Sequence, residues 1–161
     1  MKMMKRNILT FFLVLSISSL AISQVYDHCD VGTLKDTCKD YLTLPYRYDA
    51  SNIVLIQYRH RSQVKEVVLP MFFGEHYIFI FNTYALPPGI EIDVYDKDEF
   101  HGDRKTLFSL NSSSAKKVSV FEPGKHHRRL YVDYMIPKKQ SESPDDIPDV
   151  SGCGVLVVGY R

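Results

Sequence analysis

Much of the chain after residue 52 alternates between hydrophobic and polar positions, as β-strands with one face exposed do. Ile90, Ile92 and Val94 follow this pattern, and so does 128–136, where we expect Asp133 to face solvent. These stretches are rich in Val, Ile, Tyr and Phe, and turn-forming residues separate them. The pattern predicts eight strands, at 53–58, 64–71, 75–83, 90–96, 104–110, 116–121, 128–136 and 153–160.

Two of the predicted strands are hydrophobic on both faces. Residues 77–81 and 155–158 contain no charged side chain, so we expect them at the centre of a sheet, covered on both sides. Residues 33–42 have the i, i+4, i+7, i+8 spacing of a helix that faces a core, and this helix can supply the second cover. We expect Thr33 to be its N-cap and Pro45 to follow its end.

Eight short strands with polar turns favour an antiparallel β-sandwich of jelly-roll or Greek-key type with one short N-terminal helix. An up-and-down closed barrel is the alternative. We predict an exposed loop at 141–149, which holds two prolines and four acidic residues. The predicted core consists of the inward positions of four neighbouring strands: Phe79, Phe81, Ile92, Val94, Leu130, Val132, Val155 and Val157.

The first 23 residues have a different composition from the rest. A basic start precedes an uncharged, mostly apolar run at 8–22, which ends in the small-x-small site Ala21-Ile22-Ser23. This is the pattern of a secretory signal peptide, and the run is shorter than the roughly 20 residues of a membrane-spanning helix. We therefore expect 1–23 to be removed and 24–161 to form a single domain without a transmembrane segment. Its expected location is the periplasm, the cell surface or the medium.

The charge balance of the expected domain is close to neutral. The leader holds three of the 20 lysines and arginines, which leaves 17 basic and 19 acidic residues and a net charge near −2. Nucleic-acid-binding domains need a basic footprint, so the sequence argues against a nucleic-acid partner.

Three cysteines remain in the domain, so at least one has no partner within the chain. Cys29 and Cys38 lie on either side of the predicted helix start, and a helix rises about 1.5 Å per residue. We therefore expect them not to be joined to each other. A bond between Cys38 and Cys153 is an alternative if the helix covers the last strand; otherwise we expect both to be packed, unreactive thiols.

Several short motifs occur along the domain in a fixed order. They are Cys29 with Gly32, Asp40-Tyr41-Leu42, Tyr46-Arg47-Tyr48-Asp49, Phe72-Phe73-Gly74-Glu75-His76-Tyr77, Ile92-Asp93-Val94-Tyr95-Asp96-Lys97-Asp98, Thr106-Leu107-Phe108 and the terminal stretch from Gly152 to Tyr160. The arrangement resembles a group of small exported β-sandwich proteins of unknown function found in Bacteroidota. The chain departs from that group at Cys38 and Pro87-Pro88. The resemblance implies a fold and an exported location, and it carries over no catalytic residue.

One acidic turn is a candidate metal site. Asp96, Asp98 and Asp103 follow a predicted strand and are similar to the calcium loop of a C2 domain, because clustered carboxylates supply hard oxygen ligands. A C2 site needs a second acidic loop, and the stretch 49–52 offers one carboxylate only. We therefore expect a charged hairpin turn without a cofactor, with calcium binding as the alternative.

Two basic turns are a candidate anion-binding patch. Their residues are Arg59, His60 and Arg61 in the first turn and His126, His127, Arg128 and Arg129 in the second. If both turns lie at the same end of the sandwich, they form a positive patch suited to sulfated or acidic polymers. Solvated turn tips are the alternative.

The sequence contains no Gly-x-Ser-x-Gly elbow, His-Glu-x-x-His helix or phosphate-binding glycine loop. We therefore expect a non-enzymatic accessory or interaction protein of the cell envelope that binds another protein. The alternative function is a calcium- or glycan-binding module of lectin-like or C2-like type, for which the partner is an extracellular glycan.

Overall fold

The computed structural model describes residues 29–138 and 150–161. The predictions of a signal peptide at 1–23 and of an exposed loop at 141–149 lie outside the described residues.

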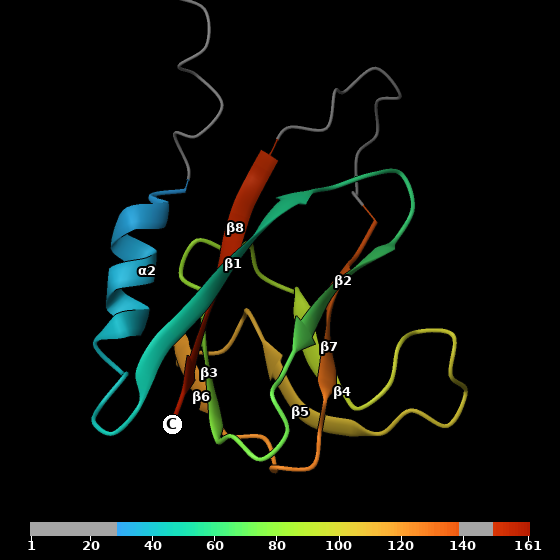
Figure 1. Ribbon diagram of the computed structural model, residues 1–161. Helices are drawn as coiled ribbons and strands as arrows, with labels where there is room; N and C mark the ends of the chain where they lie inside the picture. The colour runs from blue at the N-terminus through green and yellow to red at the C-terminus, as the bar shows by residue number, and fades with distance from the viewer. Residues whose placement is uncertain (1–28, 139–149) are drawn as a thin grey trace, which may run out of the picture.

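The described residues form eight strands in two four-stranded antiparallel sheets that pack face to face (Figure 1). The first sheet has the strand order β1-β8-β3-β6 and the second the order β2-β7-β4-β5, which is the order of a jelly roll. The predicted antiparallel sandwich is therefore confirmed. The strands are β1 (Arg47–Gln57), β2 (Gln63–Pro70), β3 (Tyr77–Asn82), β4 (Glu91–Tyr95), β5 (Thr106–Asn111), β6 (Val118–Phe121), β7 (Arg129–Ile136) and β8 (Val150–Tyr160).

The largest difference from the predicted strand boundaries is at β1, which begins at Arg47 and not at residue 53. Its first residues are polar and mostly exposed, so their side chains give no hydrophobic alternation. Backbone pairing with the long strand β8 keeps them extended, beginning with Arg47 opposite Tyr160.

Helix α2 (Val31–Lys39) covers the outer face of the first sheet (Figure 1). It begins two residues before the predicted start and ends three residues before the predicted end. The predicted N-cap was wrong: the cap is Asp30, whose carboxylate accepts a hydrogen bond from the backbone N–H of Thr33 at 3.1 Å. Leu34 and Cys38 pack on β3 and β8, which confirms the expected second cover.

The core between the sheets contains the predicted residues of β3, β4 and β7. The prediction for β8 was wrong by one residue. Val155 and Val157 are buried, but they face the helix, whereas Leu156 and Val158 face the other sheet. The register explains this, because Leu156 and Val158 lie directly opposite the inward-facing phenylalanines of β3.

A disulfide joins Cys29 to Cys153 with a Cα–Cα distance of 5.9 Å, and it ties the segment before α2 to β8. The expectation that Cys29 and Cys38 are not joined is confirmed. The alternative bond from Cys38 to Cys153 was wrong, as was the expectation of a packed free thiol at Cys153. Cys38 is the buried free cysteine, and burial raises the pKa of its thiol to about 11.

Within the described residues, no helix has the length and hydrophobicity needed to cross a membrane.

Candidate ligand-binding site

The outer face of the second sheet carries a row of three carboxylates. Glu66 on β2 lies opposite Asp133 on β7, and Asp133 in turn lies opposite Asp93 on β4. Side chains at directly opposite positions are about 5 Å apart at Cβ, and like charges there repel each other. The row therefore needs positive charge or hydrogen-bond donors nearby.

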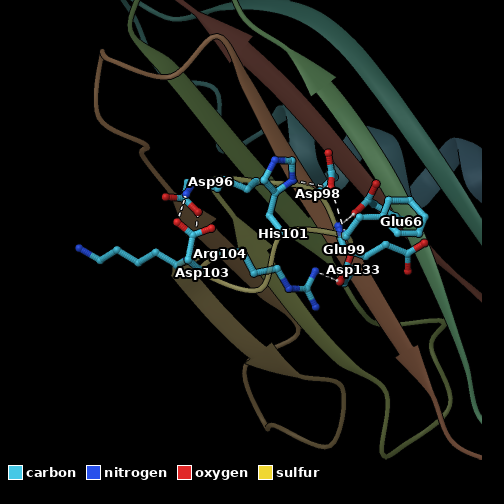
Figure 2. A network of polar contacts seen from close by, with 11 residues as sticks. Glu66, Asp96, Asp98, Glu99, His101, Asp103, Arg104 and Asp133 are labelled. Atoms are coloured by element: carbon cyan, nitrogen blue, oxygen red, sulfur yellow. Dashed lines mark hydrogen bonds and ion pairs between the residues drawn. The ribbon is translucent and has the colours of Figure 1, made fainter.

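The β4–β5 loop, residues 96–105, supplies both as it crosses this face (Figure 2). The backbone N–H of Glu99 donates to Oε2 of Glu66 at 3.0 Å, which fixes the loop over β2. Nη1 of Arg104 donates to Oδ2 of Asp133 at 2.7 Å. The guanidinium also lies over the ring of Tyr95, 3.8 Å from its centroid.

This loop explains why the expectation of a solvent-facing Asp133 was wrong. The side chain of Asp133 is only 1% exposed, and that of Arg104 is 25% exposed. One oxygen of Asp133, Oδ1, has no hydrogen-bond partner among the described residues. The burial of this carboxylate therefore depends on its ion pair with Arg104.

Burial and neighbouring charges shift the pKa values of Glu66 and Arg104 in and beside the row. Burial raises the pKa of Glu66, and the charges of Asp133 and Glu99 act in the same direction, whereas the hydrogen bond from the N–H of Glu99 lowers it in part. Partial burial works against the charge of Arg104, but the hydrogen bond and charge of Asp133 raise its pKa overall.

The candidate calcium ligands Asp96, Asp98 and Asp103 all lie in this loop, which joins β4 and β5 as the predicted hairpin connection. Each carboxylate has its own partner in the protein. Asp96 accepts from the backbone N–H of Lys105 at 2.7 Å. Asp98 pairs with His101 at 2.7 Å, and Asp103 pairs with Lys97. These side-chain hydrogen bonds lower the pKa of both Asp98 and Asp103.

Across the described residues, no three His, Cys, Asp or Glu side chains are grouped so that they could hold a metal ion. Figure 2 shows the loop carboxylates directed to different partners. The expectation of a charged turn without a cofactor stays a prediction, with calcium binding as its alternative.

The predicted anion-binding patch was wrong as a single surface. Arg59, His60 and Arg61 lie in the β1–β2 turn, before Gln63, which pairs with Ile136. The other basic turn, 126–129, leads into β7 at the opposite end of β2, where Pro70 pairs with Arg129. Seven residue steps at about 3.3 Å separate the two ends, or about 23 Å (Figure 1).

The second basic turn lies beside a hollow that the first turn does not reach. This hollow is open, has a volume of about 700 Å³ and lies where β2 ends and β7 begins. Arg128 and Arg129 are exposed, and Asp96 is the acidic residue of the lining. The full lining is Pro70, Asp96, His126, His127, Arg128, Arg129 and Tyr131.

No protein-family model matches the sequence, and a comparison with curated proteins gives no match. Among solved structures, the structure of TmCBM61 in complex with beta-1,4-galactotriose is similar to this chain. The sequence identity is 9% and the TM-score is 0.35. The matched region covers 76% of this chain and 92% of that chain.

Two further open hollows lie toward the other end of the same sheet, with volumes of about 500 and 430 Å³. Glu91 lines both, and Asp93 lines the smaller one. Their linings contain no lysine, arginine or histidine. The linings of these two hollows therefore differ in charge from that of the hollow beside the β6–β7 turn, although Arg59, His60 and Arg61 lie in the turn that leads into this end of β2.

Sequence reasoning identified the basic turn but missed the residues that complete its hollow. Pro70 and Tyr131 come from two strands, and their proximity to the turn depends on the pairing of β2 with β7. It also missed the pair of Arg104 with Asp133. A signal for that pair was present, because an aspartate in a largely hydrophobic strand needs a cationic partner if it is covered.

Proposed function

We propose that the protein is an exported, non-enzymatic binding module that takes an acidic polysaccharide into the hollow beside the β6–β7 turn. The observation that carries the proposal is the composition of the lining, in which two arginines and two histidines border one tyrosine. The volume of about 700 Å³ is in the range of roughly 300–1,000 Å³ that is usual for ligand sites.

The chemistry of these side chains suits carboxylate or sulfate groups. A guanidinium presents a planar fork of donors that can bind either group with two hydrogen bonds. Arg128 lies in the bend just before β7, Arg129 is the first residue of that strand, and both side chains line the hollow. They can therefore contact successive charged groups of a polymer. Tyr131 adds a half-buried aromatic ring to the lining.

The net charge near −2 of the expected domain supports a local rather than a general attraction for anions. A near-neutral domain offers a polyanion no overall attraction, so binding should depend on a local group of basic residues such as the one at this hollow. The partner first expected from the sequence, another protein of the cell envelope, stays a prediction.

The test is titration calorimetry with polygalacturonate as the acidic polysaccharide and dextran as the neutral one. The variant Arg128→Ala with Arg129→Ala removes two charges from the hollow. The matched control, Arg59→Ala with Arg61→Ala, removes two charges at the opposite end of β2. We expect the first pair to weaken polygalacturonate binding about tenfold or more and the control to change it less than about twofold. Equal losses in both variants, or no binding by the parent protein, would contradict the proposal.

A further inference from the structure

Two consecutive phenylalanines are exposed beside the basic hollow. The β2–β3 loop, residues 71–76, holds Phe72 at 77% exposure and Phe73 at 68%. Single exposed apolar residues are common, but a pair of neighbouring aromatic rings leaves a large apolar area in contact with water. Such patches mark binding surfaces.

The loop is held in place by hydrogen bonds to well-packed parts of the fold. The backbone N–H of Met71 donates to the carbonyl of Arg128 at 2.9 Å, which joins this loop to the basic turn. The N–H of Phe72 donates to the hydroxyl of the buried Tyr77 at 3.1 Å. Gly74 then turns the chain back with a φ of 91°, a conformation that glycine adopts without strain. The rings of Phe72 and Phe73 are therefore exposed on a loop that hydrogen bonds hold in place.

Arg128 connects the aromatic pair to the hollow. Its guanidinium lies 5.9 Å from the centroid of the Phe73 ring, and the same side chain lines the hollow. A ligand that contacts Arg128 can therefore also reach the exposed ring of Phe73 and the basic residues that line the hollow.

We propose that Phe73, with Phe72 beside it, is a stacking platform at the entrance of the hollow, and that it selects a polymer of acidic sugars. This inference rests on the proposed function and adds the sugar ring to the recognised chemistry. A pyranose ring has an apolar face of C–H groups, and the negative face of an aromatic ring attracts these groups. The charged group of the same residue or of the next one then pairs with Arg128.

A polymer of acidic sugars contacts the phenylalanines with its sugar rings and the arginines with its charged groups. A polyanion without sugar rings would use the cations and leave the phenylalanines in water. A neutral polysaccharide would use the rings and leave the arginines unpaired. An anionic lipid surface also offers charge and an apolar region, but it presents no sugar ring for the phenylalanines to stack on, and the vesicles in the experiment below distinguish the two occupants.

The experiment compares Phe73→Ala with a matched control, Phe100→Ala, which removes an 88% exposed phenylalanine from the β4–β5 loop. Binding is measured to polygalacturonate, to polyglutamate as a polyanion without sugar rings, and to vesicles of phosphatidylglycerol with phosphatidylcholine. We expect Phe73→Ala to weaken polygalacturonate binding about three- to tenfold and to leave polyglutamate binding unchanged. The control should change neither.

The outcomes separate this inference from the proposed function. If the arginine pair is needed for polygalacturonate binding but Phe73→Ala has no effect, or weakens both polymers equally, the platform is wrong and the proposed function stands. If the parent protein binds no polygalacturonate, both are wrong. If it binds the vesicles in a Phe73-dependent way and not the polysaccharide, the occupant is a lipid surface and the inference is overturned.

Discussion

Replacing Arg104 by methionine should strongly destabilise the fold, because it removes the cation that pairs with a buried carboxylate. The two side chains are joined at 2.7 Å, and Asp133 is 1% exposed. Removing one partner of a buried ion pair costs about 3–5 kcal/mol. Arg104 is 25% exposed, so water can partly replace it, and we expect the lower end, about 3 kcal/mol. The loss of the contact with Tyr95 adds about 0.5–1 kcal/mol.

Urea unfolding near neutral pH measures this cost. For a domain of this size, it corresponds to a fall in Tm of roughly 8–12 °C. Asp133→Asn keeps the shape of the side chain and an oxygen that can accept from Arg104, so it should cost less. In the Asp133→Asn background, Arg104→Met should cost no more than about 1 kcal/mol, because no buried charge is left uncompensated. A cost below about 1 kcal/mol for Arg104→Met alone, or an equal cost in both backgrounds, would show that the burial of Asp133 does not depend on Arg104.

Three further predictions concern the acidic row, the core and the β4–β5 loop. Burial raises the pKa of Glu66 above its ordinary 4.5, so the folded state favours the protonated form of this side chain. The stability that protonated Glu66 contributes is present at low pH and is lost as the pH rises through the raised pKa. Glu66→Gln should therefore raise Tm near pH 7 and leave it unchanged near pH 4, and a lower Tm near pH 7 would show that the charged hydrogen bond from Glu99 dominates. Phe79→Ala should lower the free energy of unfolding by about 3–5 kcal/mol in denaturant melts, because Phe79 is fully buried between the sheets. The control Lys125→Ala, at the exposed β6–β7 turn, should lower it little. Equal unfolding midpoints for the two variants would contradict the assigned core. Calcium at millimolar concentration should raise Tm no more than magnesium at equal ionic strength, and a calcium-specific rise that disappears in Asp96→Asn with Asp98→Asn would overturn this expectation.

The sequence could predict the fold because its alternating segments mark strands independently of their partners. The same signal fails where alternation is absent. Residues 155–158 are apolar at every position, so nothing in the pattern distinguishes the face of Val155 from that of Leu156, and the pairing with β3 decides between them. The polar start of β1 was missed for the related reason that its partner strand, and not its side chains, makes it extended.

The positions of the candidate site residues depend on strand pairing even more strongly than the strand boundaries do. The turns at 58–62 and 122–128 each precede a strand, β2 and β7, and these strands pair antiparallel, so the two turns lie at opposite ends. The sequence shows both turns but not this pairing. The burial of Asp133 likewise results from a loop that crosses two strands to reach Glu66. Local patterns describe single segments, and both of these features join segments that are distant in sequence.

A map of the bound surface shows directly whether the hollow beside the β6–β7 turn binds the polysaccharide. Two-dimensional NMR of the ¹⁵N-labelled protein, titrated with oligogalacturonate, reports which backbone amides change environment on binding. We predict that the shifted resonances gather at residues 71–73 and 126–131, around the basic hollow and the aromatic pair. Shifts concentrated at residues 59–65, at the opposite end of β2, or an unchanged spectrum at saturating ligand, would contradict it.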